Sequence, residues 1–489
     1  MEISNFSQSS TNVMGLGPSP TTIDAGFDIV RNYAHKIEFN LKNVSVAFAN
    51  TLRRSFSTLC PTVTFTKESI TILENTTPLH NEFLIHRLEL VPIYNIGAGG
   101  VLQLKTYYDK ETHERRWEFL DPAVPKFLLN TNLPETVLID NVSMNNTKNI
   151  TTESFIVSSG DTIYPTEDYF RKDSHTGDSI LINCIKSDLY SGNNIDNLSL
   201  EAYPVPGIGK MHTRNDPTGT VEYQFVIADD SKIDSVWEKK LIYLKKHRIM
   251  GGMEPYNDTE LAQLKSSYDL LDKHRVFETD SNGRANHFNF KVESIGFLSA
   301  DVIVYDAAKH LELCIDDIIS STKFKVVDAT NNLYGLDRSG FKKFSVKKID
   351  TVNQGATITL KNENHTLGNL IQSKIREKYL VDIHDTTDSA KYLKMATYRM
   401  DHPTIEEIEV MLVPKDSIST DIINAILNKY ISEKYHSAGL MKIDNNNRVL
   451  YFAVYLFIQA LEAIKLDIAN FLQLYGDISS IEGPSYEMI

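Results

Sequence analysis

The sequence predicts an α+β fold that contains two related helical modules in one chain. Two stretches about 315 residues apart, Ala49 to Arg54 and His365 to Leu370, each lead into a segment whose apolar residues recur every three or four positions, as in an amphipathic helix. Alternating apolar and polar runs, typical of strands, lie near both. Burying an apolar helix face gains about 25 cal/mol per Å². We therefore expect the two modules to pair as an intramolecular pseudo-dimer.

The expected domain boundaries follow glycine-rich and polar interruptions of the pattern. A segment with its own strands and Asn-rich loops divides the first module, which indicates an inserted, mainly β domain. A stretch of mixed polarity then links the two modules. The expected layout is a flexible leader at 1–25, the first module at 26–96 and 203–320, the inserted domain at 97–202, a linker at 321–342, the second module at 343–475 and a tail at 476–489.

Each module is expected to combine strands with two helices. In the first module, the helix after Ala49 ends by Pro61, and a second helix spans Val302 to Ile319. In the second module, the last helix, at about 450–474, has a broad apolar face that we expect to pack against the helix at 302–319; burial against its own sheet is the alternative. The expected strands lie at 37–41, 63–65, 101–108, 116–120, 154–157, 179–185, 221–226, 357–360 and 407–413.

Two additional helices are expected at 234–248 and 258–275, the second begun by a capping box between Asn257 and Glu260. The first carries a conspicuous basic run, for which a solvated helix face is expected, with contact to nucleic acid or to an acidic partner as the alternatives. The run consists of Lys239, Lys240, Lys245, Lys246, His247 and Arg248.

Six short motifs, in order along the chain, resemble those of the assembly platform of cellular RNA polymerases. That platform is the pair of D and L subunits in archaea and the third-largest and eleventh subunits in eukaryotes, and the bacterial alpha N-terminal domain is its homodimeric relative. Four motifs resemble the D side and the last two resemble the L side, which implies a fusion, as in large cytoplasmic DNA viruses. A viral origin is therefore expected. The motifs are Asn50–Arg54, Glu82–Pro92, Gly207–His212, Phe290–Gly296, His365–Asn369 and Tyr398–Pro403.

The resemblance implies two groups of site residues. Contact with the second-largest, beta-like subunit is implied for Asn50, Arg53, Arg54, Gly207, Gly209, Lys210 and His212. Structural or dimerisation roles are implied for His86, Arg87, Glu293, Gly296, His365, Thr366, Leu367, Gly368, Asn369, His402 and Pro403.

The chemistry of these residues gives more specific expectations. Neighbouring helical residues point about 100° apart, so at least one of the two arginines faces outward, where a guanidinium can bind a carboxylate bidentately. An intramolecular ion pair is the alternative. Aligning Thr51 with Thr366 places Gly368 and Asn369 opposite the arginines, so one arm would take the second-largest subunit and the other the largest.

Local contexts suggest further roles. His365 and Thr366 are expected to cap the second module's helix. Glu293 is a candidate buried partner for an arginine, with exposure as the alternative. The glycines at 207 and 209 are expected to permit a close backbone approach to a partner, or to form a plain surface turn. His86 and His402 lie in or beside strand-like stretches, where hydrogen-bonded structural roles are expected.

Composition argues against several function classes. The net charge is −14, so the chain as a whole repels a phosphate backbone. Its cysteines, Cys60, Cys184 and Cys314, lie far apart without a Cys-x-x-Cys pair, so no metal is expected, although several D-type subunits bind one in their inserted domain. The start lacks a secretory signal, and the longest apolar run is about a dozen residues, so an intracellular chain without a membrane span is expected.

No arrangement of residues indicates catalysis or a cofactor. The segment around Gly207 lacks the glycine and hydroxyl residue that complete a phosphate-binding loop. Asp382, Asp385 and Asp388 recur in a polar stretch, 382–394, expected to be a solvated loop rather than a magnesium site. No catalytic residue, cofactor or metal is therefore predicted.

These observations predict a non-catalytic subunit of a multisubunit DNA-directed RNA polymerase that nucleates assembly. Its expected partners are the second-largest and largest subunits and small polymerase subunits, with DNA reached only through the complex. No homodimer is expected, because each dimer face is already occupied. If viral, the chain belongs in the host cytoplasm, in viral factories, and in the virion. The alternatives are a DNA-binding transcription factor that uses the basic helix at 239–248, and an independent enzyme.

Overall fold

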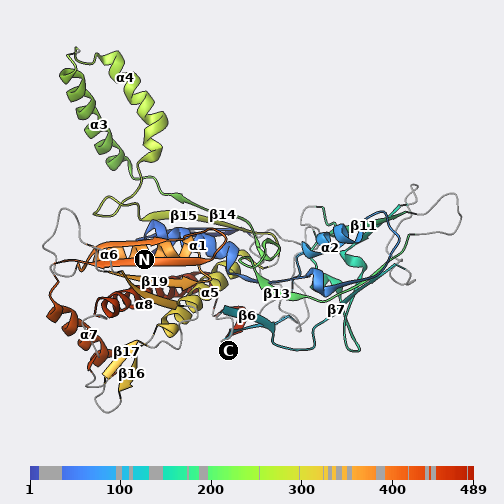
Figure 1. The fold of residues 1–489 in the computed structure, drawn as a ribbon. Helices are drawn as coiled ribbons and strands as arrows, with labels where there is room; N and C mark the ends of the chain where they lie inside the picture. The colour runs from blue at the N-terminus through green and yellow to red at the C-terminus, as the bar shows by residue number, and fades with distance from the viewer. Residues whose placement is uncertain are drawn as a thin grey trace.

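The computed structural model describes residues 1–9, 36–94, 102–109, 114–131, 147–172, 176–186, 196–252, 254–296, 298–322, 324–328, 333–336, 344–349, 355–380, 391–416, 418–435, 440–441, 448–481 and 483–488. Helices and mostly antiparallel sheets alternate along it, as the α+β prediction requires. Figure 1 shows a helix-rich body beside a β-rich region, with a pair of helices projecting from the body.

The first module is a four-stranded antiparallel sheet against which α1 (Val46–Thr58) and α5 (Ala300–Ser321) pack. Helix α1 begins where the Ser45 hydroxyl accepts a hydrogen bond from the Phe48 amide, and it buries Ala49, Leu52 and Phe56. The strands, in sheet order, are β1 (Glu2–Ser9), β2 (Lys36–Lys42), β15 (His287–Ser294) and β14 (Thr218–Phe225).

Strand β1 lies within the stretch expected to be a flexible leader, and that expectation is wrong for residues 2–9. Glu2 pairs with Lys42, and Ser9 pairs with Lys36. Because main-chain hydrogen bonds to the edge of β2 hold this strand, its polar side chains show little of the alternation that marks a strand in sequence. The remaining leader residues, 10–25, lie outside the described residues.

The second module is a second antiparallel sheet with three helices. Its helices are α6 (His365–Tyr379), α7 (Thr420–Tyr435) and α8 (Arg448–Ser479). Helix α7 was not predicted. The strands, in sheet order, are β18 (Phe344–Ile349), β19 (Gly355–Lys361), β21 (Glu407–Pro414) and β20 (Leu393–Arg399).

The stretch expected to be a plain linker, 321–342, contains two strands, so that expectation is partly wrong. Strands β16 (Phe324–Asp328) and β17 (Leu333–Leu336) pair with each other, and β17 pairs with β22 (Leu440–Met441). Phe324 is buried, and its ring lies against Tyr430 of α7. The stretch is thus anchored to the second module.

One hydrophobic core joins the two modules. Helix α1 contacts α6, and α5 contacts α8, as predicted for the last helix. Lys465 of α8 lies 2.6 Å from Asp316 of α5, and Tyr475 packs its ring edge-on against Phe39 of β2. Helix α8 also contacts β18, β19 and β21, so burial against its own sheet occurs as well.

Among the described residues, α8 is the one helix that is long and apolar enough to cross a membrane. The side chains on its apolar face are buried in the core shared by the two modules. This burial accounts for its hydropathy without a bilayer, because a helix in contact with α5, α6 and three strands is apolar over most of its circumference.

The β-rich region has a separate core around a five-stranded sheet. The core also takes in Val63 and Phe65 from β3 (Pro61–Thr64) and the turn after it, so this packing unit begins before residue 97, where the inserted domain was expected to start and which lies outside the described residues. The sheet's strands, in order, are β10 (Thr162–Tyr164), β9 (Phe155–Ser159), β7 (Lys126–Asn130), β12 (Leu198–Ala202) and β4 (Ile70–Asn75).

A three-stranded sheet joins this region to the first module. Strands β5 (Leu104–Asp109) and β6 (Glu114–Phe119) pair with β23 (Tyr486–Met488). The expected tail at 476–489 is thus partly structured, because α8 runs to Ser479 and β23 returns to the β-rich region. Arg115 of β6 makes two hydrogen bonds, of 2.7 and 2.9 Å, to the carboxylate of Asp317 on α5. Two further strand pairs belong to the region, β8 (Thr147–Thr151) with β11 (Leu181–Lys186) and β3 with β13 (Val205–Ile208).

His86 and Arg87 lie in a helix, α2 (Asn81–Glu89), not in a strand-like stretch. The His80 ring accepts a hydrogen bond from the Glu82 amide at its start. Leu84 and Leu88 are its buried residues. Their spacing of four positions is helical, and the short apolar run hid that period from the sequence analysis.

The two additional helices form an antiparallel hairpin that stands away from the rest of the molecule (Figure 1). Helix α3 (Asp230–Met250) is longer than expected. Helix α4 (Asp258–Ser267) starts with the predicted capping box between Asn257 and Glu260. It is shorter than expected, because a π-turn at Tyr268–Asp272 and a 3₁₀ turn at Lys273–Arg275 follow it.

Candidate functional site

The two motif-bearing helix starts lie side by side. Helices α1 and α6 contact each other, and a cleft of about 200 Å³ lies between them. Its lining combines residues of both motifs with one residue of β20, and it is mostly polar. The lining residues are Asn50, Thr51, Arg54, His365, Thr366, Asn369 and Tyr398.

On α1, the two arginines have different environments. Arg53 is half-buried, and its Nε donates a hydrogen bond to the Asn50 side-chain oxygen at 3.1 Å. Arg54 is exposed and lines the cleft, so the prediction that one arginine faces outward is confirmed. Among the described residues, neither makes the intramolecular ion pair that was the alternative. The Arg54 guanidinium is therefore accessible to a binding partner at this face.

On α6, the capping prediction is wrong by one residue. The Asn364 side chain accepts the hydrogen bond from the Thr366 amide at 3.0 Å, so Asn364 is the N-cap. His365 lies instead beside Tyr398, with 3.3 Å between its Nδ1 and the phenol oxygen. Both Asn and Thr are suitable caps, and the sequence alone did not show which residue ends the extended backbone.

Gly368 allows α6 to approach strand β20. A Cβ atom at this position would lie 2.6 Å from Cδ2 of Tyr398, which is closer than carbon atoms can pack. Leu367 beside it is in the shared core. The residues opposite Arg53 and Arg54 in the second module, Gly368 and Asn369, thus carry no charge, and the first of them is fixed by packing.

The glycines of the Gly207–His212 segment make close approaches within the chain. A Cβ on Gly209 would overlap the Ser57 carbonyl oxygen at the end of α1, and one on Gly207 would overlap the Asn215 side chain. Lys210 donates a hydrogen bond of 2.7 Å to the Asn362 carbonyl of the second module. Within this chain, Gly209 thus permits a close approach to α1 and Gly207 a close approach to Asn215, and Lys210 bridges the two modules.

The remaining predicted residues are dispersed. The Glu293 carboxylate lies 2.9 Å from Lys291, not beside an arginine, and this hydrogen bond keeps its pKa below the usual value. Gly296 has φ +115°, which favours glycine. His86 is exposed, and Arg87 donates to the Leu181 carbonyl at 2.7 Å.

Two more predicted residues lie in an exposed turn after β20, far in sequence from the helix starts. His402 contacts the Thr404 hydroxyl through Nδ1 at 2.7 Å, and Pro403 is exposed. The hydrogen bond expected for this histidine is present as this short local contact. His212 has a similar role, since its Nδ1 accepts a hydrogen bond from the Arg214 amide at the start of a short 3₁₀ turn.

Sequence reasoning missed the buried carboxylate of Asp306 on α5. Its oxygens accept hydrogen bonds from the amide and hydroxyl of Ser485, in the segment before β23. Burial raises its pKa to about 7, although the two hydrogen bonds act in the opposite direction. The adjacent Tyr486 is buried edge-on against Trp117 of β6. No local pattern indicates contacts between residues so far apart in the chain.

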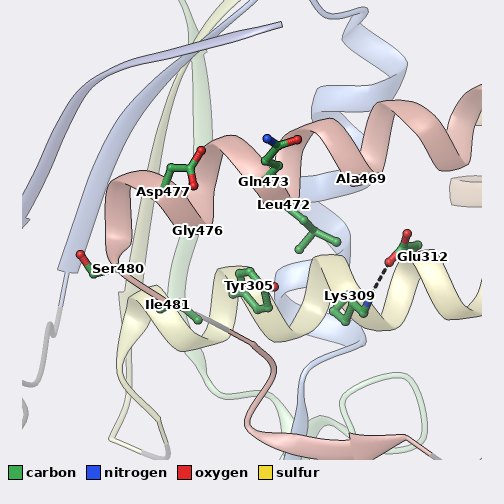
Figure 2. A pocket seen from close by; sticks show the side chains of 10 residues that line it. All are labelled: Tyr305, Lys309, Glu312, Ala469, Leu472, Gln473, Gly476, Asp477, Ser480 and Ile481. Carbon is green, nitrogen blue, oxygen red and sulfur yellow. Dashed lines mark hydrogen bonds and ion pairs between the residues drawn. The ribbon is translucent and has the colours of Figure 1, made fainter.

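A larger cleft, of about 570 Å³, lies between α5 and α8. Figure 2 shows its lining, where Lys309 is paired with Glu312 at 2.7 Å and Asp477 and Ser480 stand at the end of α8. Gly476 lies close to the Ile481 carbonyl, where α8 gives way to the returning segment. The cleft is open and contains none of the predicted site residues.

Within the described residues, no group of three or more His, Cys, Asp or Glu side chains is placed to hold a metal ion. The carboxylates at 382, 385 and 388 lie outside the described residues. Helices paired across a core, rather than side chains converging on a pocket, are thus the main feature of the described chain. This defines an α+β protein in which two modules of sheet and helices share one core.

Comparison with known proteins identifies the family. The model of the RNA polymerase Rpb3/Rpb11 dimerisation domain matches residues 38–314. The chain belongs to this family. The match covers most of the first module together with the β-rich region, and it confirms the resemblance to the subunits of this family.

Several relatives are named as subunits of DNA-directed RNA polymerases. The chain is 25% identical over 309 residues to DNA-directed RNA polymerases I and III subunit RPAC1 of Bos taurus, which covers 58% of this chain and 80% of that protein. It is 24% identical over 300 residues to DNA-directed RNA polymerases II, IV and V subunit 3 of Arabidopsis thaliana, covering 58% and 86%. DNA-directed RNA polymerase subunit Rpo3 of Methanopyrus kandleri is 37% identical over 67 residues, covering 14% and 24%.

Proposed function

We propose that the chain is a non-catalytic assembly subunit of a multisubunit DNA-directed RNA polymerase, in which one polypeptide stands for the D and L pair. The contact between α1 and α6, each entered through one copy of the motif, carries this proposal. The names of the relatives and the family match support membership of such an enzyme. The proposal includes two further statements: residues 343–475 correspond to an L subunit, and the protein is of viral origin.

Covalent linkage gives the proposed pairing its advantage. Two modules in one chain meet at an effective concentration on the order of millimolar when the connection spans the sites comfortably. Strands β16 and β17 anchor the connection, and the ion pair between Lys465 and Asp316 bridges α8 and α5. The stoichiometry of the two halves is then fixed, and neither half retains a free dimer face. This arrangement favours a chain that remains monomeric until larger subunits bind.

The chemical difference between the two helix starts supports a division of partners. Arg54 offers an exposed guanidinium at the α1 side of the cleft, whereas the aligned position on α6 is Asn369. An arginine can bind a carboxylate with two parallel hydrogen bonds, which asparagine cannot. We place the second-largest subunit at the α1 side and the largest at the α6 side. Small polymerase subunits would join the same complex, and DNA would be reached only through it.

The DNA-binding alternative depends on the basic run of α3. Part of that run is neutralised within the hairpin, because Lys240 pairs with Asp272 and Arg248 pairs with Glu260. The charge left for a phosphate backbone is therefore smaller than the sequence suggests.

With a viral origin, the complex would work in the host cytoplasm and be packaged in the virion.

Co-expression with the second-largest polymerase subunit of the same genome tests the proposal. We expect a one-to-one complex by size-exclusion chromatography with light scattering, and weaker binding for Arg54→Ala. Arg376→Ala is the matched control, because this exposed arginine lies at the far end of α6. A chain that does not bind the second-largest subunit would contradict the proposal. Complex formation that Arg54→Ala leaves unchanged would contradict the assigned contact alone.

A further inference from the structure

Helix α3 has one face that α4 does not cover. Along the helix, Trp237, Leu241 and Leu244 are half-buried and mark the face turned towards α4. Large apolar side chains on the opposite face are exposed. They are Ile242 at 67%, Tyr243 at 60%, Ile249 at 63% and Met250 at 74%.

The exposed apolar residues form one stripe. Ile242 and Ile249 are seven positions apart, as are Tyr243 and Met250, so each pair lies on one side of the helix and the two pairs form adjacent rows. The two helices already have a small core of their own at their base, made by Ile233, Tyr268 and Val276 with Trp237. The stripe is not needed to complete that core. Such residues projecting into water mark a surface that another molecule can cover.

The lysines around the stripe are not neutralised within the hairpin. Lys239, Lys245 and Lys246 are exposed, and none has an ion pair among the described residues. From Lys239 to Met250, α3 contains five Lys or Arg residues and no carboxylate. This is a local excess of positive charge on a chain with a net charge of −14.

We propose that this face of α3 binds an acidic amphipathic segment of another protein, with apolar side chains against Ile242, Tyr243, Ile249 and Met250 and carboxylates towards Lys239, Lys245 and Lys246. Protein interfaces are enriched in Tyr and Met, and both occur on this face. A helix with apolar residues at matching spacing is a suitable ligand for such a stripe.

The chemistry of the face disfavours two other occupants. A phosphate backbone would satisfy the lysines but would leave two isoleucines and a methionine without apolar contact. A second copy of the chain would bring the same lysines together across a two-fold interface, where like charges repel. The inference holds whichever larger complex the chain joins.

Site-specific crosslinking tests the proposal. The photocrosslinker p-benzoylphenylalanine would be placed at Tyr243 in the full chain, and the native complex purified through a tag on this chain before illumination. We expect a crosslinked peptide from another protein in which Asp and Glu alternate with large apolar residues. The control position is Ile163 on β10, which is similarly exposed at 72%. Crosslinks to nucleic acid or to a second copy of this chain, or no more product than at Ile163, would overturn the proposal.

Charge and apolar variants then separate the two parts of the surface. Lys245→Glu with Lys246→Glu, and Ile242→Ser with Ile249→Ser, should each lower the crosslink yield by about tenfold, since both electrostatic and apolar contacts hold the segment. Lys429→Glu and Ile163→Ser are the matched exposed controls and should leave the yield unchanged. A yield that the lysine variant leaves unchanged would contradict an acidic partner. Circular dichroism would verify that the hairpin stays folded.

Discussion

The starts of α1 and α6 lie on opposite sides of one cleft, yet their chemistry differs. The α1 side has an exposed arginine, Arg54, and the aligned position on the α6 side is Asn369. The structural constraints differ as well. The end of α1 is approached by the backbone at Gly209, whereas the start of α6 is approached by the ring of Tyr398. Similar helices in one chain can therefore be positioned by different contacts and can offer different groups to partners.

The largest effect is expected from Gly209→Ala, because the new methyl group would overlap a backbone carbonyl at Ser57. Neither backbone segment can rotate away as a side chain can. We expect a loss of about 3 kcal/mol in the free energy of unfolding, the upper end for an overpacked site. Chemical denaturation of the wild type and the variant measures it. Gly483→Ala is a control for substituting glycine in an open place, since no atom lies near its Cβ position and its φ is not positive.

Gly368→Ala should cost less, about 1–2 kcal/mol, because a side chain rather than the backbone must move. Its Cβ would meet the ring of Tyr398, which is partly exposed and can shift. In a Tyr398→Ala background, the same substitution should be nearly neutral. A double-mutant cycle on unfolding free energies isolates the coupling. Strictly additive effects would show that the ring does not limit the approach of α6.

A pH dependence should distinguish α5 from its partner α8. Burial raises the pKa of Asp306 on α5 from the ordinary 3.8 to about 7, whereas the buried side chains of α8 are apolar or aromatic. The folded state disfavours the charged form of Asp306. Its contribution to the free energy of unfolding is therefore largest below the pKa that Asp306 has in the unfolded chain, and it is lost as the pH rises towards about 7. We expect Asp306→Asn to reduce the fall in melting temperature between about pH 4 and about pH 7. An unchanged pH profile would rule out Asp306 as its source.

The smallest effect is expected from Lys210→Met, which removes one hydrogen bond between the modules. The ammonium donates to the Asn362 carbonyl at 2.7 Å and lies 3.6 Å from Glu406. A single bond of this kind contributes about 1 kcal/mol. Limited proteolysis between the modules should accelerate slightly, and the variant should still bind the second-largest subunit. A loss of binding with unchanged stability would instead make Lys210 a direct contact.

Local periodicity carried most of the information that the sequence held about this fold. Helices α1, α5, α6 and α8 have continuous apolar stripes, and each was expected near its observed position. The short helix α2 was missed because only Leu84 and Leu88 are buried, too few residues to distinguish a period of four from a period of two. Strand β1 was missed because edge pairing needs no particular side chains.

The site was predictable where the motif itself makes the contact, and not where distant segments meet. That one arginine of the α1 pair faces outward followed from helix geometry alone. The contacts of Lys210 with Asn362 and of Asp306 with Ser485 join residues more than a hundred positions apart, so no local pattern could indicate them. The roles of Gly207 and Gly209 depended in the same way on which segment lay beside them.

The mass of the purified chain in solution tests the proposed internal pairing most directly. If the two modules occupy each other's helix faces, light scattering should give the mass of a single chain, 55.4 kDa, across a wide range of concentrations. A mass that rises towards twice that value as the protein concentration increases would show that a dimer face remains free, and would contradict the account.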